Sequence, residues 1–277
     1  IHVGDEPTGI LVTDTTAWVA LSGANQVAQV DLDTRTIVQT LDVGREPRAM
    51  VLDAERNRLY VASLISSNEH PRGPIQGADE ELPLLATRDI AIIDTAAGEV
   101  VDFVPHVGTI LRGLWLSADG DTLVVGVSHS QNQKLAIDAE SRPHVHGLAF
   151  VDVSEDSPLS VTQLDLDQQE SSTGAAPSPF SMLADPDTGS LWITLSAGAS
   201  VLEVDSTTFA EKSRTMTGND PRGLIRVGDR MWTYAWLDNR LDGFSVAEGV
   251  DSTSIVSIPV GVDPTPEDIK IGQRIFN

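Results

Sequence analysis

The chain contains no cysteine, which excludes disulfide bonds, thiolate catalysis and haem attachment through a CxxCH motif within its 277 residues. Lysine is scarce, and only Lys134, Lys212 and Lys270 are present. No run of about 18 apolar residues occurs, so the sequence offers no candidate for a membrane-spanning helix. It also lacks a nucleophile elbow, a glycine-rich phosphate loop and an HExxH motif. The sequence therefore gives no indication of an α/β-hydrolase, a nucleotide-binding enzyme or a zinc metalloprotease, the classes that these motifs identify.

Basic residues are also few: the chain has 18 basic and 41 acidic residues, and its formal net charge is -23. A surface of this sign repels phosphate backbones, so nucleic acid is not expected as a partner. The simplest interpretation is a solvated acidic surface. With 40% hydrophobic residues the composition is that of a globular protein.

What the sequence does contain is a unit that recurs five times. Each unit opens with a turn: VGDEPTGI (3–10), VGREPRAM (43–50), VGTILRGL (107–114), PSPFSML (177–183) and GNDPRGLI (218–225). A short apolar strand, a polar turn and a second strand follow, the second strands being AWVALS, RLYVASL, TLVVGVS, SLWITLS and MWTYAWL. A third strand and a more polar fourth strand complete the unit. Four short strands of this kind predict an antiparallel meander.

Two kinds of residue recur inside the units. The third strand ends in aspartate in four of the five units, at Asp31, Asp94, Asp152 and Asp205. A short carboxylate there can accept hydrogen bonds from backbone N–H groups two residues on, so we expect these residues to fix the turn into the fourth strand. Tryptophans recur on second strands, at Trp18, Trp192 and Trp232, and are expected to pack between neighbouring units.

The pattern VG-x-x-P-x-G, then RLYVAS, then IAIIDT followed by GEVV, resembles the YVTN family of β-propeller repeats. The resemblance covers residues 1 to about 263 and implies an all-β fold of five four-stranded antiparallel blades, at about 1–42, 43–106, 107–176, 177–217 and 218–263. It further implies a seven-bladed ring. The chain opens in the middle of a repeat, at Ile1 to Gly4, so two more blades are expected upstream.

The segment 264–277 differs from the repeats. Pro266, Glu267 and Asp268 favour a helix start, because acidic residues in the first turn face the positive end of the helix dipole. The spacing G-x-x-x-F behind this start is similar to the opening helix of c-type cytochrome domains of the dihaem peroxidase kind, which follow YVTN propellers in related proteins. This resemblance implies a haem domain downstream. The alternative is a C-terminal helix that packs on the propeller.

Three long links depart from the repeat: residues 65–88, 129–146 and 168–179. In a blade, the link from the second to the third strand and the link from the fourth strand to the next blade emerge on the same face. Long links in a compact repeat are uncommon without a function, so we expect these three to form one binding surface.

Histidines concentrate in this surface. The candidate residues for ligand binding are His70, Arg72, His106, His129, His144 and His146, with His2 at the matching place near the chain start. Imidazole titrates near neutral pH and ligates metals. His144 and His146 lie two residues apart on an extended segment and point the same way, so the pair is also a candidate site for a metal ion.

Three arginines, Arg48, Arg112 and Arg222, occupy the same register where the chain enters the innermost strand. Converging guanidinium groups would bind a small anionic ligand or an acidic side chain of a partner domain. The alternative is that each arginine pairs with a nearby acid such as Asp5, Glu46 or Asp220.

The leading hypothesis is a propeller portion of an exported, periplasmic or extracellular redox protein, which binds a ligand or partner and serves as a docking platform for a c-type haem domain. Such a portion is not expected to be catalytic by itself. One alternative is a binding protein without a cofactor. Another is an enzyme that holds a metal or redox cofactor in the central funnel.

Overall fold

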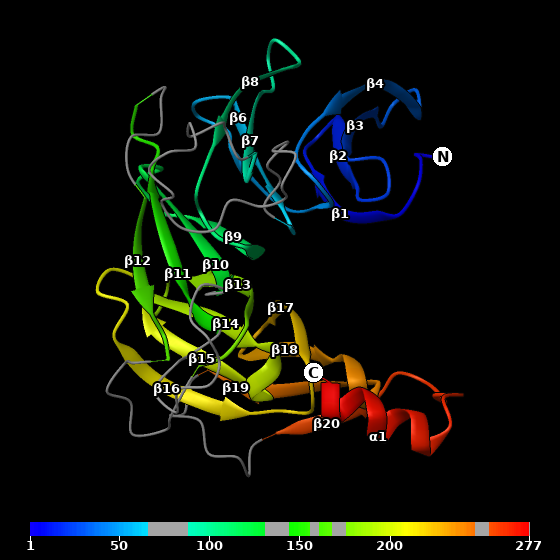
Figure 1. Ribbon diagram of the computed structural model, residues 1–277, viewed down its shortest axis with the longest axis vertical. Helices are drawn as coiled ribbons and strands as arrows, with labels where there is room; N and C mark the ends of the chain where they lie inside the picture. Colours follow the sequence, from blue (N-terminus) through cyan, green and yellow to red (C-terminus); the bar gives the residue numbers. More distant parts are fainter. Residues whose placement is uncertain (66–87, 131–143, 156–160, 168–175, 247–254, 277) are drawn as a thin grey trace. The chain divides into compact units, whose positions relative to one another are not determined.

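A computed structural model describes residues 1–65, 88–130, 144–155, 161–167, 176–246 and 255–276 (Figure 1). The candidate residues His70 and Arg72 lie outside these ranges. The chain divides into two compact units, Ile1–Leu164 and Asp165–Asn277.

The first unit consists of three four-stranded antiparallel sheets, each with its strands in chain order. The strands of the three sheets are β1 (Pro7–Val12), β2 (Thr16–Leu21), β3 (Gln26–Asp31) and β4 (Thr36–Asp42); β5 (Pro47–Asp53), β6 (Arg58–Ser63), β7 (Ile90–Asp94) and β8 (Glu99–Val104); and β9 (Ile110–Leu116), β10 (Thr122–Ser130), β11 (His144–Asp152) and β12 (Val161–Asp165), whose last residue belongs to the second unit.

The second unit adds two sheets of the same topology and a helix. Its elements are β13 (Pro179–Asp185), β14 (Ser190–Leu195), the 3-10 turn η1 (Ser196–Gly198), β15 (Ser200–Asp205), β16 (Glu211–Met216), β17 (Pro221–Val227), β18 (Arg230–Ala235), the 3-10 turn η2 (Trp236–Asp238), β19 (Arg240–Ser245), β20 (Val256–Pro259) and α1 (Glu267–Phe276). Five four-stranded antiparallel blades in a propeller arrangement are therefore confirmed, whereas a ring of seven stays a prediction.

Hydrophobic cores lie between the first and second, the second and third, and the fourth and fifth blades, because the second and third strands are largely buried on both faces. Trp18 of the first blade packs with Leu59, Val61 and Ile93 of the second blade. Trp192 packs in the same way against the fifth blade, where its ring lies 5.6 Å from that of Phe244. The predicted inter-blade packing is confirmed for these two tryptophans. Trp232 belongs to the fifth blade, the last one in this chain, and is half-buried against Gly243 of its own blade, so its packing between blades stays a prediction.

The aspartates that end the third strands fix the following turns, as predicted. Oδ1 of Asp31 accepts from the Thr34 N–H at 2.7 Å, and Oδ1 of Asp205 accepts from the Thr208 N–H at 2.8 Å. Asp94 and Asp152 make equivalent bonds to the backbone of the turns that follow them. Backbone hydrogen bonds of this kind lower the pKa values of the Asp31, Asp94 and Asp205 carboxyl groups, whereas the Ser154 hydroxyl and then the Ser154 N–H lower that of Asp152.

The first strand of every blade carries a register shift near its start. Such a bulge re-aims the side chain at that position. The bulge of the first blade packs closely against the bulge of the second blade. A Cβ atom added at Gly9 would lie 2.0 Å from the Arg48 carbonyl oxygen. Thr8 donates its hydroxyl proton to the Pro47 carbonyl oxygen at 3.0 Å across the same boundary. Adjacent bulges are thus in contact.

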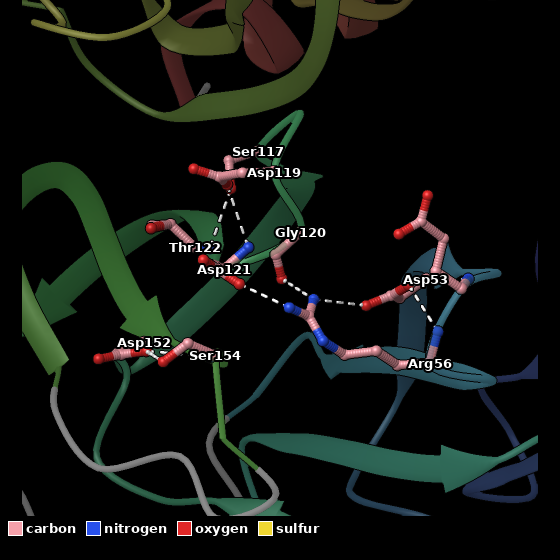
Figure 2. A network of polar contacts seen from close by, with 10 residues as sticks. Asp53, Arg56, Ser117, Asp119, Gly120, Asp121, Thr122, Asp152 and Ser154 are labelled. Atoms are coloured by element: carbon pink, nitrogen blue, oxygen red, sulfur yellow. Dashed lines mark hydrogen bonds and ion pairs between the residues drawn. The ribbon is translucent and has the colours of Figure 1, made fainter.

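At the other end of the first strands, arginines connect neighbouring blades. Figure 2 shows Arg56 of the second blade between Asp53 of its own turn and the turn of the third blade. Its Nη1 donates to Asp53 Oδ2 at 3.0 Å and to the Gly120 carbonyl oxygen at 2.7 Å, and its Nη2 donates to Asp121 Oδ1 at 2.6 Å. Arg226 of the fifth blade contacts Asp185 and Asp187 of the fourth blade in the same way.

One predicted link is shorter than expected. The sequence predicts an insertion at residues 129–146, but β10 continues to Ser130 and β11 begins at His144. The two strands pair in continuous register from Thr122 with Asp152 to Ser130 with His144. His129, His144 and His146 therefore lie on strands, because the two strands satisfy each other's backbone groups beyond the length of the other blades.

Candidate functional site

Two kinds of link meet on one face of each blade, which we call the link face. The chain entering the first strand accepts a hydrogen bond from the residue that follows the second strand, as in Ser22 N–H to the Glu6 carbonyl and Trp236 N–H to the Asp220 carbonyl. The turn after the second strand also accepts a hydrogen bond from the residue that follows the fourth strand. An example is the bond from the Val260 N–H to the Asn239 carbonyl oxygen. The predicted meeting of these links is confirmed within individual blades.

The backbone just before the first strand is left-handed at Glu6, Glu46, Ser178 and Asp220, with φ between 47° and 58°. A proline follows each of them, and proline disfavours the right-handed helical conformation of the residue before it. The chain therefore turns sharply at the link face. This turn holds Glu46 and Asp220 two residues before Arg48 and Arg222.

In the first unit, Arg48 and Arg112 occupy the bulges of β5 and β9, which contact each other as neighbouring inner strands. The Nη2 of Arg48 lies 3.5 Å from Glu46 Oε2, and its side chain is 41% exposed. Arg48 therefore forms the ion pair with a nearby acid that was the alternative to a ligand site. Its Nε is buried and has no hydrogen-bond partner among the described residues.

In the second unit, Arg222 is held more firmly. Its Nε and Nη2 donate to Asp220 Oδ2 at 3.1 and 2.7 Å, so Arg222 also forms the predicted alternative ion pair. Its guanidinium carbon lies 4.2 Å from the centre of the Trp236 ring and 5.3 Å from that of Phe180. Phe180 occupies the bulge of β13, so the bulge residues of the fourth and fifth blades meet here. Convergence of all three arginines stays a prediction, because Arg48 and Arg112 belong to the first unit.

Trp236 and Phe180 are residues that the sequence analysis did not select. The sequence pattern of MWTYAWL predicts a single strand, but β18 ends at Ala235 and η2 turns Trp236 out of the sheet. The Trp236 N–H bonds to the Asp220 carbonyl, and Asp238 accepts from the Asn219 N–H at 2.8 Å. The Leu-Asp-Asn run after Trp236, in which Asn239 is left-handed, is the signal that would have ended the strand earlier.

The histidines divide between the two faces of the third blade. His146 lies opposite Ser128 and His144 opposite Ser130, so this pair shares one face, as predicted. The Nδ1 of His146 lies 2.8 Å from Ser128 Oγ. His129 lies opposite Val145 on the other face, so it does not join the pair.

His129 is largely enclosed, and burial lowers its pKa, although a hydrogen bond with Gln163 opposes this shift. Its Nε2 is buried without a hydrogen-bond partner among the described residues. His106 is exposed, and its backbone is left-handed with φ 59°. The next residue, Val107, donates its N–H to the Asp89 carboxylate at 2.8 Å.

The part of the chain that the structure describes holds no group of three or more histidine, aspartate or glutamate side chains arranged for a metal ion. A metal ion at His144 and His146 stays a prediction. Nor does any helix in the described ranges have the length and apolar character needed to cross a bilayer.

A cavity of about 370 Å³ lies at the opposite end of the third blade from His144. Its lining is formed by Asp121, Thr122, Phe150, Asp152, Ser154 and Thr162. Figure 2 shows its aspartates already engaged: Asp121 with Arg56, and Asp152 with the hydroxyl and N–H of Ser154. These contacts explain the geometry of two turns without a ligand.

Comparison with known proteins identifies the fold. No protein-family model matches the chain, and no curated protein matches it in sequence. Among solved structures, hydrazine synthase of Kuenenia stuttgartiensis is 17% identical with a TM-score of 0.57, over 87% of this chain and 84% of that chain. The Cps50 (Swd1) β-propeller domain of Myceliophteria thermophila is 13% identical with a TM-score of 0.62, over 93% and 72%.

A chain of the mitotic checkpoint complex is 12% identical with a TM-score of 0.58, over 92% of this chain and 64% of that chain. At these identities the likeness concerns the fold alone, which is the β-propeller. The YVTN family and a cytochrome partner stay predictions.

Proposed function

We propose that this chain is the partner-binding propeller of an exported redox protein, and that the link face of its second unit is the docking platform for a c-type haem domain. On this proposal the propeller binds and positions, and the haem domain carries electrons. The protein is then periplasmic or extracellular, where c-type haem domains of this kind are found. Its structural neighbours include an enzyme and a chain of a protein assembly, so the fold is compatible with partner binding.

The observation that carries the proposal is the path of the chain after the last blade. Helix α1 contacts η2, the turn that carries Trp236 on the link face. The approach to the helix is fixed: Asn239 Nδ2 donates to the Gly261 carbonyl at 3.2 Å, and Lys270 pairs with Asp263 at 3.2 Å. A domain following α1 would therefore begin beside the link face.

The absence of cysteine from residues 1–277 makes this proposal testable with a single dye. The test uses this chain together with the proposed haem domain, which we call the full-length protein. In it, a Val260→Cys variant labels the link face, because Val260 is 54% exposed and its N–H bonds to Asn239. Thr207→Cys labels the opposite end of the fourth blade as the matched control. The six residues of β15 between the two ends correspond to about 20 Å. A thioether-bound haem leaves no free thiol to compete for the label.

We expect the full-length protein to show a Soret band and the dye at position 260 to be quenched more strongly than the dye at position 207. For each labelled position, the fluorescence is compared with that of residues 1–277 carrying the same cysteine and the same dye. A full-length protein without a Soret band removes the haem domain from the proposal. Equal quenching at both positions, or stronger quenching at position 207, contradicts docking on the link face.

A second candidate function is binding of a small anionic ligand in the first unit. The observation that favours it is the adjacency of the bulges that carry Arg48 and Arg112, since the equivalent bulge residues Phe180 and Arg222 of the second unit approach to 5.3 Å. Two neighbouring guanidinium groups suit a dicarboxylate. Calorimetric titration with succinate should show binding that Arg48→Gln or Arg112→Gln abolishes and that the exposed control Arg45→Gln retains. Unchanged titrations in all three variants would exclude this site.

A further inference from the structure

Arg222, Trp236, Phe180 and Asp220 form a cluster on the link face of the second unit, which we call the Trp236 cluster. Asp220 anchors it, because its side chain is only 4% exposed and it accepts two N–H groups of Arg222. Trp236 lies on the guanidinium and is itself 42% exposed. Each member is thus held in place while part of the cluster faces solvent.

The hydrogen bonds of Arg222 use only one edge of its guanidinium. Asp220 Oδ2 occupies the side formed by Nε and Nη2. The outer edge, formed by Nη1 and the second N–H of Nη2, makes no hydrogen bond to the residues that the structure describes. A planar guanidinium presents this edge as a rigid pair of parallel donors. The contact with the Trp236 ring and the two hydrogen bonds to Asp220 restrict the rotation of this guanidinium.

The charge balance of the cluster indicates which acceptors suit this edge. The buried carboxylate of Asp220 compensates the charge of Arg222, and Asp242 compensates Arg240 nearby at 2.9 Å. Asp238 contributes a further negative charge beside them. A neutral or slightly negative surrounding does not favour a free anion. Neutral carbonyl oxygens, such as those of a polypeptide backbone, satisfy the two donors without adding charge.

The exposed ring of Trp236 adds an apolar contact next to these donors. Tryptophan and arginine are both enriched in the energetic centres of protein interfaces. Tryptophan buries a large area with few rotatable bonds, and arginine presents a planar group with several fixed donors. The cluster also borders the existing contact between α1 and η2, where the chain already packs a segment against this face.

We infer that the Trp236 cluster is a contact site for a polypeptide, which packs an apolar side chain on Trp236 and presents backbone carbonyls to the outer edge of Arg222. This inference rests on the proposed function for the identity of the natural partner, the domain that docks on the link face. The site itself depends only on the geometry of the cluster.

A phage library of random dodecapeptides, panned on the chain of residues 1–277, tests the site without the natural partner. We expect selected peptides to contain a bulky apolar residue. Their affinity should fall by about tenfold or more for Trp236→Ala, which is the loss typical of an interface centre. Arg222→Lys should cause a loss of similar size, because lysine keeps the charge but lacks the paired donors.

Ile225→Ala is the matched control, since Ile225 is an exposed apolar residue on the same strand, 60% exposed. It should leave the affinity of the peptides unchanged. Peptides that bind equally well to all variants, or a library that yields no binder, would overturn the inference. Retained affinity in Arg222→Lys would refute the role of the donor pair. None of these outcomes depends on a haem domain, so they are separable from the dye measurement.

Discussion

Single carboxylates define the turns at the end of the blades opposite the link face. The Oδ1 of Asp205 accepts from the N–H groups of Thr207 and Thr208, and Asp94 accepts from those of Ala96 and Ala97. Only the ionised carboxylate is a full acceptor, so these bonds lower the pKa values of both groups below the ordinary value of 3.8.

The lowered pKa values predict acid sensitivity. Because the folded-state pKa is depressed, the contribution of each aspartate to stability is complete above pH 3.8 and is lost as the pH falls through the folded-state value. Asp205→Asn keeps an Oδ1 acceptor but cannot titrate. Thermal unfolding between about pH 5 and pH 2 should therefore show a smaller acid-induced decrease in Tm for this variant than for the wild type. An identical decrease would mean that this turn does not contribute to acid unfolding.

His129 predicts a second pH effect, nearer neutrality. Burial lowers its pKa below the ordinary value of 6.5, so the unfolded chain binds this proton more readily than the folded chain. Its contribution to stability is therefore present above pH 6.5 and is lost as the pH falls through the folded-state pKa. His129→Phe should flatten the dependence of the unfolding free energy on pH between about 7 and 5, whereas the exposed control His2→Gln should not. Equal slopes for the wild type and His129→Phe would contradict this assignment.

At the scale of elements, the bulges of the first strands require close contact between blades. Gly9 lies where any side chain would meet the Arg48 carbonyl oxygen, and backbone atoms cannot move aside cheaply. Gly9→Ala should destabilise the first unit by about 1–3 kcal/mol in denaturant unfolding, the cost typical of overpacking. Gly261→Ala is the matched control, because nothing lies within 4 Å of its added Cβ. If the unfolding free energy of Gly9→Ala equalled that of the wild type, the bulges of neighbouring blades would not be in contact.

At the end of the blades opposite the link face, the guanidinium of Arg226 connects the fourth and fifth blades. Asp185 is fully buried, its Oδ1 accepts from Arg226, and its Oδ2 has no partner among the described residues. Arg226→Ala leaves this carboxylate buried without a cation and should cost about 1–3 kcal/mol. Because Arg226 is partly exposed, we expect the lower part of this range. Arg226→Lys should recover part of the loss, and a loss of equal size in both variants would mean that packing, not charge, stabilises the contact.

Sequence patterns predicted the elements whose causes are local. Asp31, Asp94, Asp152 and Asp205 bond within their own turns, so their type and position were sufficient to assign them. Trp18 and Trp192 followed from the repeat, because equivalent positions in equivalent blades bury the same face.

Features that depend on a distant partner were not predictable in this way. The extension of β10 to Ser130 depends on its pairing with β11, which begins 14 residues later in the sequence at His144. The exposure of Trp236 depends on hydrogen bonds of η2 to Asn219 and Asp220, the residues that enter the first strand of the same blade. Phe180 becomes part of the site only through the neighbouring blade.

At the scale of the whole molecule, the five blades share one topology, so function depends on which side chains stand at equivalent positions. Arg222 and Trp236 contact each other at such positions on the link face, and α1 contacts η2 there. The net charge of -23 adds a general attraction for basic partners, which should make association rates depend on salt. The local cluster then determines what is held in contact.

Amide hydrogen exchange, compared between the full-length protein and residues 1–277, tests docking on the link face most directly. Docking on the link face predicts slower exchange in the full-length protein at residues 217–222 and 236–239, which frame the Trp236 cluster. It predicts no change at the Asp205 turn, residues 205–210, on the opposite end of the neighbouring blade. Unchanged exchange at 236–239, or protection confined to 205–210, would contradict it.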